Sequence, residues 1–311
     1  MTTKYSTVKL TGVPETQLIT LYARAVETRR PDALFRDPTA VDMVDRIDYD
    51  FSKFDTNTPT TLGIAIRSQI IDDMAREYIE RHPDCVVINI AAGLDARFYR
   101  VDNGKLRWYE LDLPEAIELR RQFFRESERH HFIAANALEP DWLDQIETSA
   151  HTLVIIECLL MYFDEADVKF LLTLLAERLP GCEQLIEVLG HSQAQRTESN
   201  DMVSKTNAAF KWGIRNAADI GSWRPALQYV GDESIYDRHA ERWLAFFCFV
   251  ESSFFPIPPH PLLGLMCLAE PKKALRFGIV ATLASVLGGL FGYAIGYLAY
   301  EAVGQAVLAA L

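Results

Sequence analysis

Apolar runs alternate with helical repeats through the middle of the chain. Short apolar runs typical of buried parallel strands occur at residues 85–91, 106–113, 131–135, 152–157 and 183–189. Residues 114–127 and 164–179 have the apolar spacing of helices and begin with residues suited to helix starts. This alternation predicts an α/β fold with a doubly wound parallel sheet and a ligand site at the carboxyl ends of its strands.

A different pattern appears near the C-terminus, where residues 277–300 contain 24 consecutive uncharged, mostly apolar residues. As a helix this run would extend about 36 Å, which is enough to cross a bilayer. We therefore predict a transmembrane helix. A buried helix of a soluble protein is the alternative, but such helices seldom stay apolar on every face. Gly288, Gly292 and Gly296 recur every four residues and predict a face for a partner helix.

Residues 243–268 contain two apolar runs that are each too short to span a bilayer. Four prolines between residues 256 and 261 separate them, and prolines at this density stop a helix. We expect a broken or re-entrant hairpin with Glu251 as its single acid. Glu251 is a candidate for a proton-linked membrane function, or equally a residue at an interface or a helix cap.

The distribution of charged residues also changes near residue 240, close to the start of the apolar C-terminal segment. The protein has 43 acidic and 31 basic residues and a net charge of -12, which disfavours nucleic acid as a partner because phosphate contacts need clustered cations. Residues 240–311 contain four acids and four bases, so the net charge lies before them. Composition therefore predicts two domains, 1–242 and 243–311.

The five cysteines are scattered without the spacing of a zinc site, and the first ten residues lack the apolar stretch of a secretion signal. A reducing compartment fits these features. We expect a membrane-associated protein with a cytoplasmic enzyme domain and a C-terminal segment in contact with membrane lipid.

Three residues mark a candidate site at the strand ends. Gly93 follows the first strand in a tight turn, and Asp112 ends the second about 20 residues later, a spacing that suits an acid bonded to ribose hydroxyls. Glu157 ends the fourth strand. A lone glycine after a strand is more often only a turn, but the three together favour a site for an adenosine-type cofactor.

Four stretches of the sequence carry a resemblance to a known family. They are LYARAVETRRPDALFRDP, INIAAGLDARFYR, WYELDLPE and IIECLLMYF. They resemble the leucine carboxyl methyltransferase family and its polyketide O-methyltransferase relatives, which are class I methyltransferases that use S-adenosylmethionine. Over about residues 7–243, the resemblance implies a Rossmann-like sheet, S-adenosyl-L-methionine as cofactor and a small-molecule acceptor.

The resemblance also implies a cofactor site made of Arg67, Ala91, Gly93, Asp112, Asn136, Ala137, Glu157 and Tyr162. Asp112 would hold the ribose, and Glu157 and Tyr162 would flank the methionine end. Arg67 matches a basic residue that reaches the cofactor carboxylate, but it could equally be a solvated helix charge.

Two positions depart from the family pattern. Ala91 stands where relatives mostly have a glycine, and alanine lacks the backbone freedom of glycine. Asn136 stands where many relatives have an acid near the adenine, and its amide can still form hydrogen bonds. These departures are compatible with weaker binding of the cofactor and do not imply its loss.

The C-terminal segment resembles a second family, the DedA-type (SNARE-associated, VTT domain) membrane proteins. The resemblance rests on the stretches ESSFFPIPP and ATLASVLGGLFGYAIGY. His260 stands where that family usually has an acid, and the family's further spans do not follow Leu311. We therefore expect a partial DedA-like segment, joined to the methyltransferase by gene fusion, rather than a working transporter.

Two structural expectations concern the rest of the first domain. Residues 190–230, with Trp212 and Trp223, predict a helical lid over the acceptor. The family's sheet normally gains a final strand near residue 243, where the membrane-like sequence begins here. Either residues 244–250 substitute as that strand, or the sheet pairs its edge otherwise, or the fusion has impaired the enzyme half.

Two functions remain as hypotheses. The first is an O-methyltransferase that uses S-adenosylmethionine to methylate a carboxylate, or a hydroxyl, of a small-molecule or polyketide-like acceptor, without a metal. A carboxylate is already a nucleophile at neutral pH, whereas a hydroxyl needs a base, and all seven histidines are expected on the surface or in loops. The second is a DedA-type membrane fragment fused to a degenerate module without catalysis. Retention of Gly93, Asp112 and Glu157 favours the first.

Overall fold

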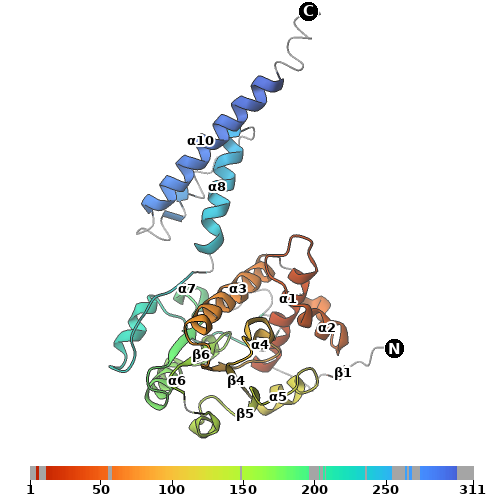
Figure 1. Cartoon of the computed structure of the whole chain (residues 1–311), viewed down its shortest axis with the longest axis vertical. Coiled ribbons are helices and arrows are strands. Elements are labelled where there is room, and N and C mark those ends of the chain that lie inside the picture. Colours follow the sequence, from red (N-terminus) through yellow and green to blue (C-terminus); the bar gives the residue numbers. More distant parts are fainter. Residues whose placement is uncertain are drawn as a thin grey trace, which may run out of the picture. The chain divides into compact units, whose positions relative to one another are not determined.

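The structure is a computed structural model that describes residues 5–6, 12–54, 58–147, 149–195, 203, 206, 208–234, 237–253, 263–264, 266–267 and 274–299. Contacts divide the chain into two compact units, Met1–Gly231 and Asp232–Leu311 (Figure 1). The first unit thus ends near residue 231, before the boundary at residue 242 that composition predicts.

Five parallel strands form the sheet of the first unit. They are β3 (Val86–Ile90), β4 (Arg107–Asp112), β5 (His130–Ala134), β6 (Thr152–Ile156) and β7 (Glu183–Ile186), in the order β5-β4-β3-β6-β7. All five coincide with predicted strands. Val86 of the central strand β3 pairs with Arg107 of β4 and with Thr152 of β6. The strand order reverses at β3, so the carboxyl ends of β3 and β6 flank the switch point where such sheets bind ligands.

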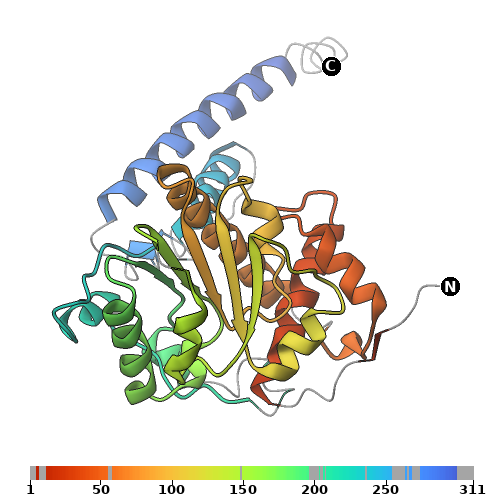
Figure 2. The ribbon, with the colours of Figure 1, turned by 60° about the horizontal axis from the view of Figure 1, so that its bottom comes forward.

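Helices cover both faces of the sheet because its central strands are apolar on both sides (Figure 2). Val87 packs on one face with α3 (Thr58–Arg81) and α4 (Arg97–Val101). Ile88 packs on the other face with α6 (Glu165–Arg178). Successive residues of a strand point to opposite faces, so β3 is buried along its whole length.

The remaining elements of the first unit are short or lie toward its N-terminus. They are β1 (Tyr5–Ser6), η1 (Val13–Thr16), α1 (Gln17–Arg29), α2 (Pro38–Arg46), β2 (Ile47–Asp48), η2 (Phe51–Phe54), α5 (Pro114–Arg120), η3 (Pro140–Gln145) and η4 (Leu160–Tyr162). The predicted helix over residues 114–127 is therefore shorter than expected. Residues of η1 and α1 face the strand ends across a cavity and so form one wall of the site.

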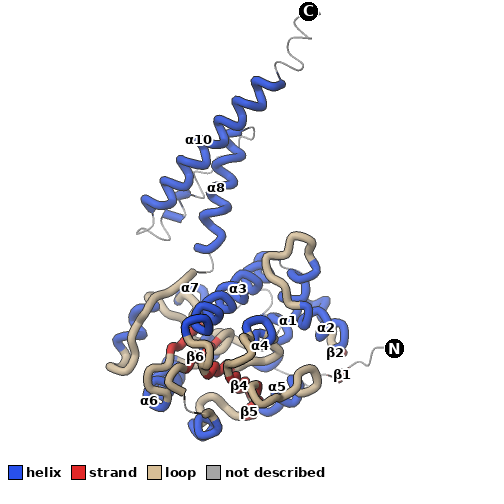
Figure 3. The backbone as a smooth tube through the Cα atoms, viewed as in Figure 1, coloured by secondary structure: helices blue, strands red, loops and turns tan. Residues whose placement is uncertain are grey.

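The prediction of a helical lid over residues 190–230 is wrong for the residues that the structure describes there. They contain only the short helix α7 (His191–Ala194) and the 3-10 helix η7 (Ala217–Ser222), and the rest is loop (Figure 3). Gly213 explains part of this, because a Cβ there would lie 2.7 Å from the Cβ of Ala194. Such close packing, with Pro225 further along, favours an irregular path over a helix.

The second unit contains α8 (Asp237–Ser253) and α10 (Ala274–Ala299). The alternative that residues 244–250 complete the sheet as a strand is wrong, because they lie within α8. Glu251 lies on α8 with its side chain partly exposed. The predicted hairpin over residues 243–268 thus begins as one helix, and its four prolines lie outside the described residues.

Two of the three glycines predicted to face a partner helix contact α8. A Cβ on Gly292 would lie 2.5 Å from the carbonyl oxygen of Ser253, and one on Gly288 would clash with the backbone of Phe249. The Ser253 hydroxyl also donates to the Gly288 carbonyl at 3.0 Å. A Cβ on Gly296, by contrast, would meet nothing within 4 Å. Gly288 and Gly292 therefore pack against α8 of the same chain.

The outer surface of α10 is apolar. Its exposed large apolar side chains are Leu275, Ile279, Leu283, Val286, Leu287, Leu290, Phe291, Tyr293, Ile295 and Tyr297. By length and composition, α10 is the one helix in the described part of the chain that could cross a membrane, over Ala274–Tyr297.

Candidate active site

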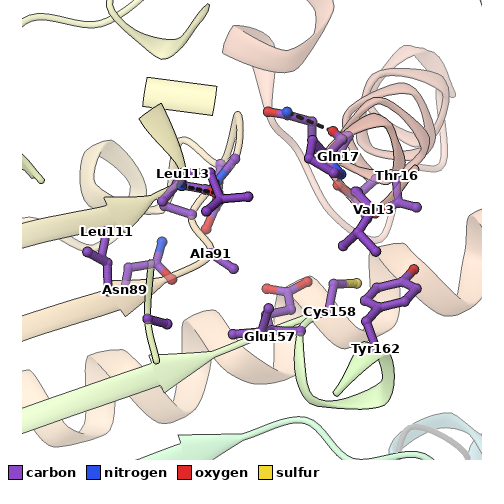
Figure 4. A pocket seen from close by; sticks show the side chains of 18 of the residues that line it. Val13, Thr16, Gln17, Asn89, Ala91, Leu111, Leu113, Glu157, Cys158 and Tyr162 are labelled. Carbon is purple, nitrogen blue, oxygen red and sulfur yellow. Dashed lines mark hydrogen bonds between the residues drawn. The ribbon is translucent and has the colours of Figure 1, made fainter. Parts of the chain in front are cut away.

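A cavity of about 420 Å³ opens at the carboxyl ends of β3, β4, β5 and β6. Seven of the eight residues predicted for the cofactor site line it: Ala91, Gly93, Asp112, Asn136, Ala137, Glu157 and Tyr162. Figure 4 shows Ala91 and Glu157 on the strand side of the cavity, with Thr16 and Gln17 across from them. The structure thus brings together seven predicted residues that are spread over 71 positions of the sequence, from Ala91 to Tyr162.

The turn after β3 has an unusual backbone. Ala91 has a φ of 57°, and Gly93 has a φ of 49°. This left-handed region is freely open to glycine but strained for other residues. Cys158, after the neighbouring strand β6, is also left-handed, with a φ of 56°. Backbone strain at two adjacent strand ends, both in the cavity wall, is typical of a functional site.

We expect Ala91→Gly to stabilise the protein. Relief of the left-handed strain contributes about 1–2 kcal/mol, and the greater freedom of glycine in the unfolded chain offsets about 1 kcal/mol of it. Chemical denaturation would therefore show a gain of up to about 1 kcal/mol. Ala92→Gly is the matched control, since Ala92 has no positive φ and should lose stability. If Ala91→Gly lowered the free energy of unfolding as much as Ala92→Gly does, the backbone at Ala91 would not be strained.

Asp112 ends β4 beneath this turn. Its carboxylate accepts hydrogen bonds from the backbone N–H groups of Gly93 and Leu113, both at 2.7 Å. Burial raises the pKa of Asp112 to about 6, although these two hydrogen bonds act in the opposite direction. Asp112 forms no ion pair with any described residue, although the Arg120 guanidinium also acts to lower its pKa. It is therefore a partly buried acid with capacity to accept further hydrogen bonds.

A buried polar network supports the same turn. Arg120 donates to the Gly93 carbonyl at 2.9 Å and forms an ion pair with Glu110. Glu110 also accepts from the Asn89 amide at 2.9 Å and lies 3.2 Å from His130 Nε2. The expectation that every histidine lies at the surface or in a loop is wrong for His130, which begins β5 and is buried. Its ring stacks on Phe98, which makes burial favourable.

Glu157 belongs to a second network, centred on Arg97. The Arg97 guanidinium contacts Asp72, Asp95 and Glu157, each at 2.7 Å. Burial alone would raise the pKa of Glu157, but the guanidinium groups of Arg67 and Arg97 outweigh it and hold that pKa below its usual range. Glu157 is therefore ionised at neutral pH.

The same network extends toward the N-terminal helices. Arg100 contacts Asp37, Asp72 and Asp95 at 2.6–3.0 Å. Arg24 contacts Asp37 at 3.1 Å and donates to the Leu94 carbonyl at 3.0 Å. These ion pairs join α1, α3, α4 and the turn after β3, so they fix the walls of the cavity to one another.

Arg67 lies on α3 and is not part of the cavity wall. It contacts Glu157 at 2.8 Å and Glu187 at 3.0 Å, and its side chain is only 11% exposed. The alternative of a solvated helix charge is therefore wrong. Its Nη2 atom is buried without a hydrogen-bond partner, so this guanidinium retains a donor beside Glu157.

Two other polar groups of the wall are neutral. Burial raises the pKa of the Cys158 thiol and of the Tyr162 phenol well above their usual ranges. Neither group is a base at neutral pH. No cluster of three His, Cys, Asp or Glu side chains in the described ranges could hold a metal ion.

Sequence reasoning missed the wall opposite the strands. Gln17 and Thr16 contribute to it, and so does Lys211 from the loop after α7. Glu15 holds this wall in place, because its carboxylate contacts Tyr49 Oη and Lys53 Nζ, each at 2.6 Å. No motif marks these positions, since their role depends on how distant segments meet.

The fold and site define an α/β enzyme of the doubly wound class with an adenosine-type ligand site. The chain belongs to the leucine carboxyl methyltransferase family, whose model matches residues 17–176. It is 33% identical over 246 residues to the tetracenomycin polyketide synthesis O-methyltransferase TcmP of Streptomyces glaucescens, which covers 76% of this chain and 91% of TcmP. This membership makes the protein a methyltransferase dependent on S-adenosyl-L-methionine, its cofactor.

Other relatives are more distant. The S-adenosyl-L-methionine-dependent methyltransferase dpfgK of Gibberella zeae is 33% identical over 186 residues, which cover 53% of this chain and 61% of dpfgK. Among solved structures, an O-methyltransferase family protein from Burkholderia thailandensis aligns at 21% identity and a TM-score of 0.42, over 56% of this chain and 55% of that one. The family match and the alignment with TcmP do not favour the hypothesis of a degenerate module without catalysis.

Proposed function

We propose that the enzyme methylates an oxygen atom, of a carboxylate or a hydroxyl, on a small organic acceptor. The observation that carries the proposal is the single cavity wall in which Asp112, Glu157 and Tyr162 lie together. TcmP, which aligns over most of its length, is an O-methyltransferase of polyketide synthesis by its name, and this supports oxygen as the methylated atom.

In this proposal the strand ends bind the cofactor. Asp112 accepts hydrogen bonds from the ribose hydroxyls, and Asn136 and Ala137 lie against the adenine. Glu157, with the free donor of Arg67 beside it, holds the amino acid end. Asp112, which lines the cavity, fits a ribose diol, and Arg67 supports the amino acid end through Glu157, since Arg67 itself lies outside the cavity wall.

Methyl transfer requires little of the residues around the acceptor beyond alignment of the reacting atoms. The bound cofactor supplies a methyl group on a sulfonium, which leaves as a neutral thioether. Tyr162 and Cys158 present uncharged groups there, and the cavity wall has mainly to hold the acceptor in line with the methyl group. A carboxylate acceptor reacts in its ionised form without a base.

Calorimetric titration of S-adenosylhomocysteine into the full-length protein in detergent tests the cofactor site. We expect micromolar binding of S-adenosylhomocysteine and no binding of ATP, which shares the adenosine but not the amino acid end. Release of S-adenosylhomocysteine from S-adenosylmethionine on addition of an acceptor would then establish transfer. A folded protein that does not bind S-adenosylhomocysteine would overturn the proposal.

Binding of S-adenosylhomocysteine should weaken as pH falls. Only ionised Asp112 accepts from both ribose hydroxyls, and its pKa of about 6 means that protonation competes with the ligand. Between pH 7.5 and pH 5.5 the affinity should fall about fourfold, because the ionised fraction falls from nearly all to about a quarter. Calorimetry across this range checks the effect. Asp112→Asn should flatten the profile, and an equally steep profile in that variant would assign the titration to another group.

We further infer that the second unit associates with a lipid bilayer. The support is the apolar outer surface of α10, which carries no charged residue between Phe277 and Tyr297. Full-length protein should float with phosphatidylcholine liposomes and resist carbonate extraction, whereas Leu287→Lys with Leu290→Lys should reduce both. A wild-type protein that stays soluble as a monomer without detergent would overturn this inference. The likeness to DedA-type proteins, a proton-linked function of Glu251 and a cytoplasmic enzyme domain stay predictions.

A further inference from the structure

The charged side chains of the cavity wall differ in whether another residue already neutralises them. They are Arg24, Asp95, Arg97, Asp112, Glu157, Asp167 and Lys211. The Arg97 guanidinium already binds three carboxylates, and Arg24 binds Asp37 and a backbone carbonyl. Lys211 is the one cation of this wall whose ammonium has no ion pair or hydrogen bond with a described residue.

The backbone fixes Lys211 at a specific place on the wall. Its N–H donates to the Met161 carbonyl at 2.7 Å, and the N–H of Trp212 donates to the same oxygen at 3.3 Å. Met161 lies in η4, directly before Tyr162. Lys211 is therefore held beside the turn proposed to bind the methionine end, while its exposed side chain lies at the rim of the cavity.

The cofactor and the acceptor can each bring a carboxylate, so each could bind a different cation of the protein. The proposed function places the cofactor carboxylate near Glu157, which the Arg67 guanidinium contacts at 2.8 Å from outside the cavity wall. This leaves the Lys211 ammonium without an anionic partner from the protein or the cofactor. A charged amine at the rim, near the reacting end of the cavity, fits a second carboxylate that arrives with the acceptor.

We propose that Lys211 binds the carboxylate of the acceptor and selects carboxylic acids over neutral hydroxyl compounds. The proposal rests on the proposed function. A carboxylate oxygen forms the new C–O bond, the S–CH₃ bond breaks with its electron pair left on sulfur, and no proton moves. Because a carboxylate needs no base to react, Lys211 orients the acceptor and offsets its charge.

Asp167 supports the opposite assignment. It also lines the cavity, and a carboxylate there could serve as the base that a hydroxyl acceptor needs. Asp167 lies in the first turn of α6, where the helix N-terminus already offsets its negative charge, whereas the Lys211 ammonium has no such partner among the described residues. The structure therefore favours Lys211 and an anionic acceptor, and the hydroxyl acceptor becomes an outcome of the test.

The test is calorimetric binding of two matched probes, 1-naphthoate and 1-naphthol, to the full-length protein saturated with S-adenosylhomocysteine. We expect 1-naphthoate to bind more tightly than 1-naphthol. Lys211→Met should weaken 1-naphthoate binding by about tenfold and leave 1-naphthol unchanged, and Lys211→Arg should retain the preference. Lys105→Met is the matched control, since Lys105 is an exposed lysine before β4, at the other end of the sheet.

The outcomes separate this proposal from the proposed function. Equal binding of the two probes, no measurable binding of either, or a preference for 1-naphthol would each overturn the role of Lys211. So would a preference for 1-naphthoate that survives in Lys211→Met. In all these cases intact binding of S-adenosylhomocysteine would leave the cofactor site standing, whereas loss of that binding in the wild type would remove the proposed function itself.

Discussion

Arg97→Met is expected to lower the free energy of unfolding by about 3 kcal/mol. Arg97 is 1% exposed and contacts three carboxylates, those of Asp72, Asp95 and Glu157. Methionine fills much of the same volume but leaves three buried acids with one cation fewer. Breaking a buried pair from one side is costly because the remaining charge stays out of water. Denaturation followed by the fluorescence of the buried Trp108 and Trp142 measures the change.

Arg129→Met is the matched control for this prediction. Arg129 contacts Asp102 at 2.6 Å, but both side chains are partly exposed, so water screens the pair. The control should therefore lose no more than about 1 kcal/mol. A loss in Arg97→Met as small as the loss in the control would show that Arg67 and Arg100 suffice for these acids.

Strand positions were predictable because the strands are continuous apolar runs. The 85–91 run contains β3, and the sheet rule that carboxyl ends meet at one edge placed Gly93 beside Asp112. The same rule placed Glu157 in the cavity wall. These predictions rest on local pattern and on general topology, and both can be derived from sequence.

The ion pairs around the site could not be predicted from spacing. Arg67 and Glu187 lie 120 positions apart, and Arg97 and Asp72 lie 25 apart on different helices. Nothing in a helix pattern distinguishes a charge that is buried and paired from one that faces water. The resemblance to the methyltransferase family marked Arg67 as a candidate, and its burial between two acids emerged only from the fold.

Tertiary packing also explains why other predictions from the sequence were wrong or incomplete. His130 looked like a loop residue, yet its contact with Glu110 and its stack on Phe98 make it part of the core. The stripe of Gly288 and Gly292 correctly marked a helix contact, but a pattern on one helix does not identify its partner. Residues 244–250 are apolar enough for a strand or a helix, and only their packing against α10 distinguishes the two.

Asp112→Ala is expected to weaken binding of S-adenosylhomocysteine by about 100-fold or more. Two hydrogen bonds from ribose hydroxyls to an ionised carboxylate contribute roughly 1.5–3 kcal/mol each, and alanine removes both. Calorimetry measures the affinity. Glu118→Ala is the matched control, because Glu118 lies on α5 close in sequence but is exposed and outside the cavity wall. Asp112→Asn is the control for the fold of the site, since its amide oxygen can still accept a hydrogen bond from the Gly93 N–H.

A comparison with Asp95 explains why Asp112, and not Asp95, should control the binding of S-adenosylhomocysteine. Asp95 is buried and Asp112 is partly buried, and both lie near the ends of adjacent strands. Burial would raise the pKa of Asp95, but the guanidinium groups of Arg97, Arg100 and Arg24 outweigh it, so its carboxylate is already neutralised by the protein. Asp112 forms no ion pair with a described residue, and burial outweighs the effect of Arg120 and raises its pKa. We therefore expect a ligand to donate further hydrogen bonds to Asp112, and affinity within threefold of wild type in Asp112→Ala would mean that the ribose binds elsewhere.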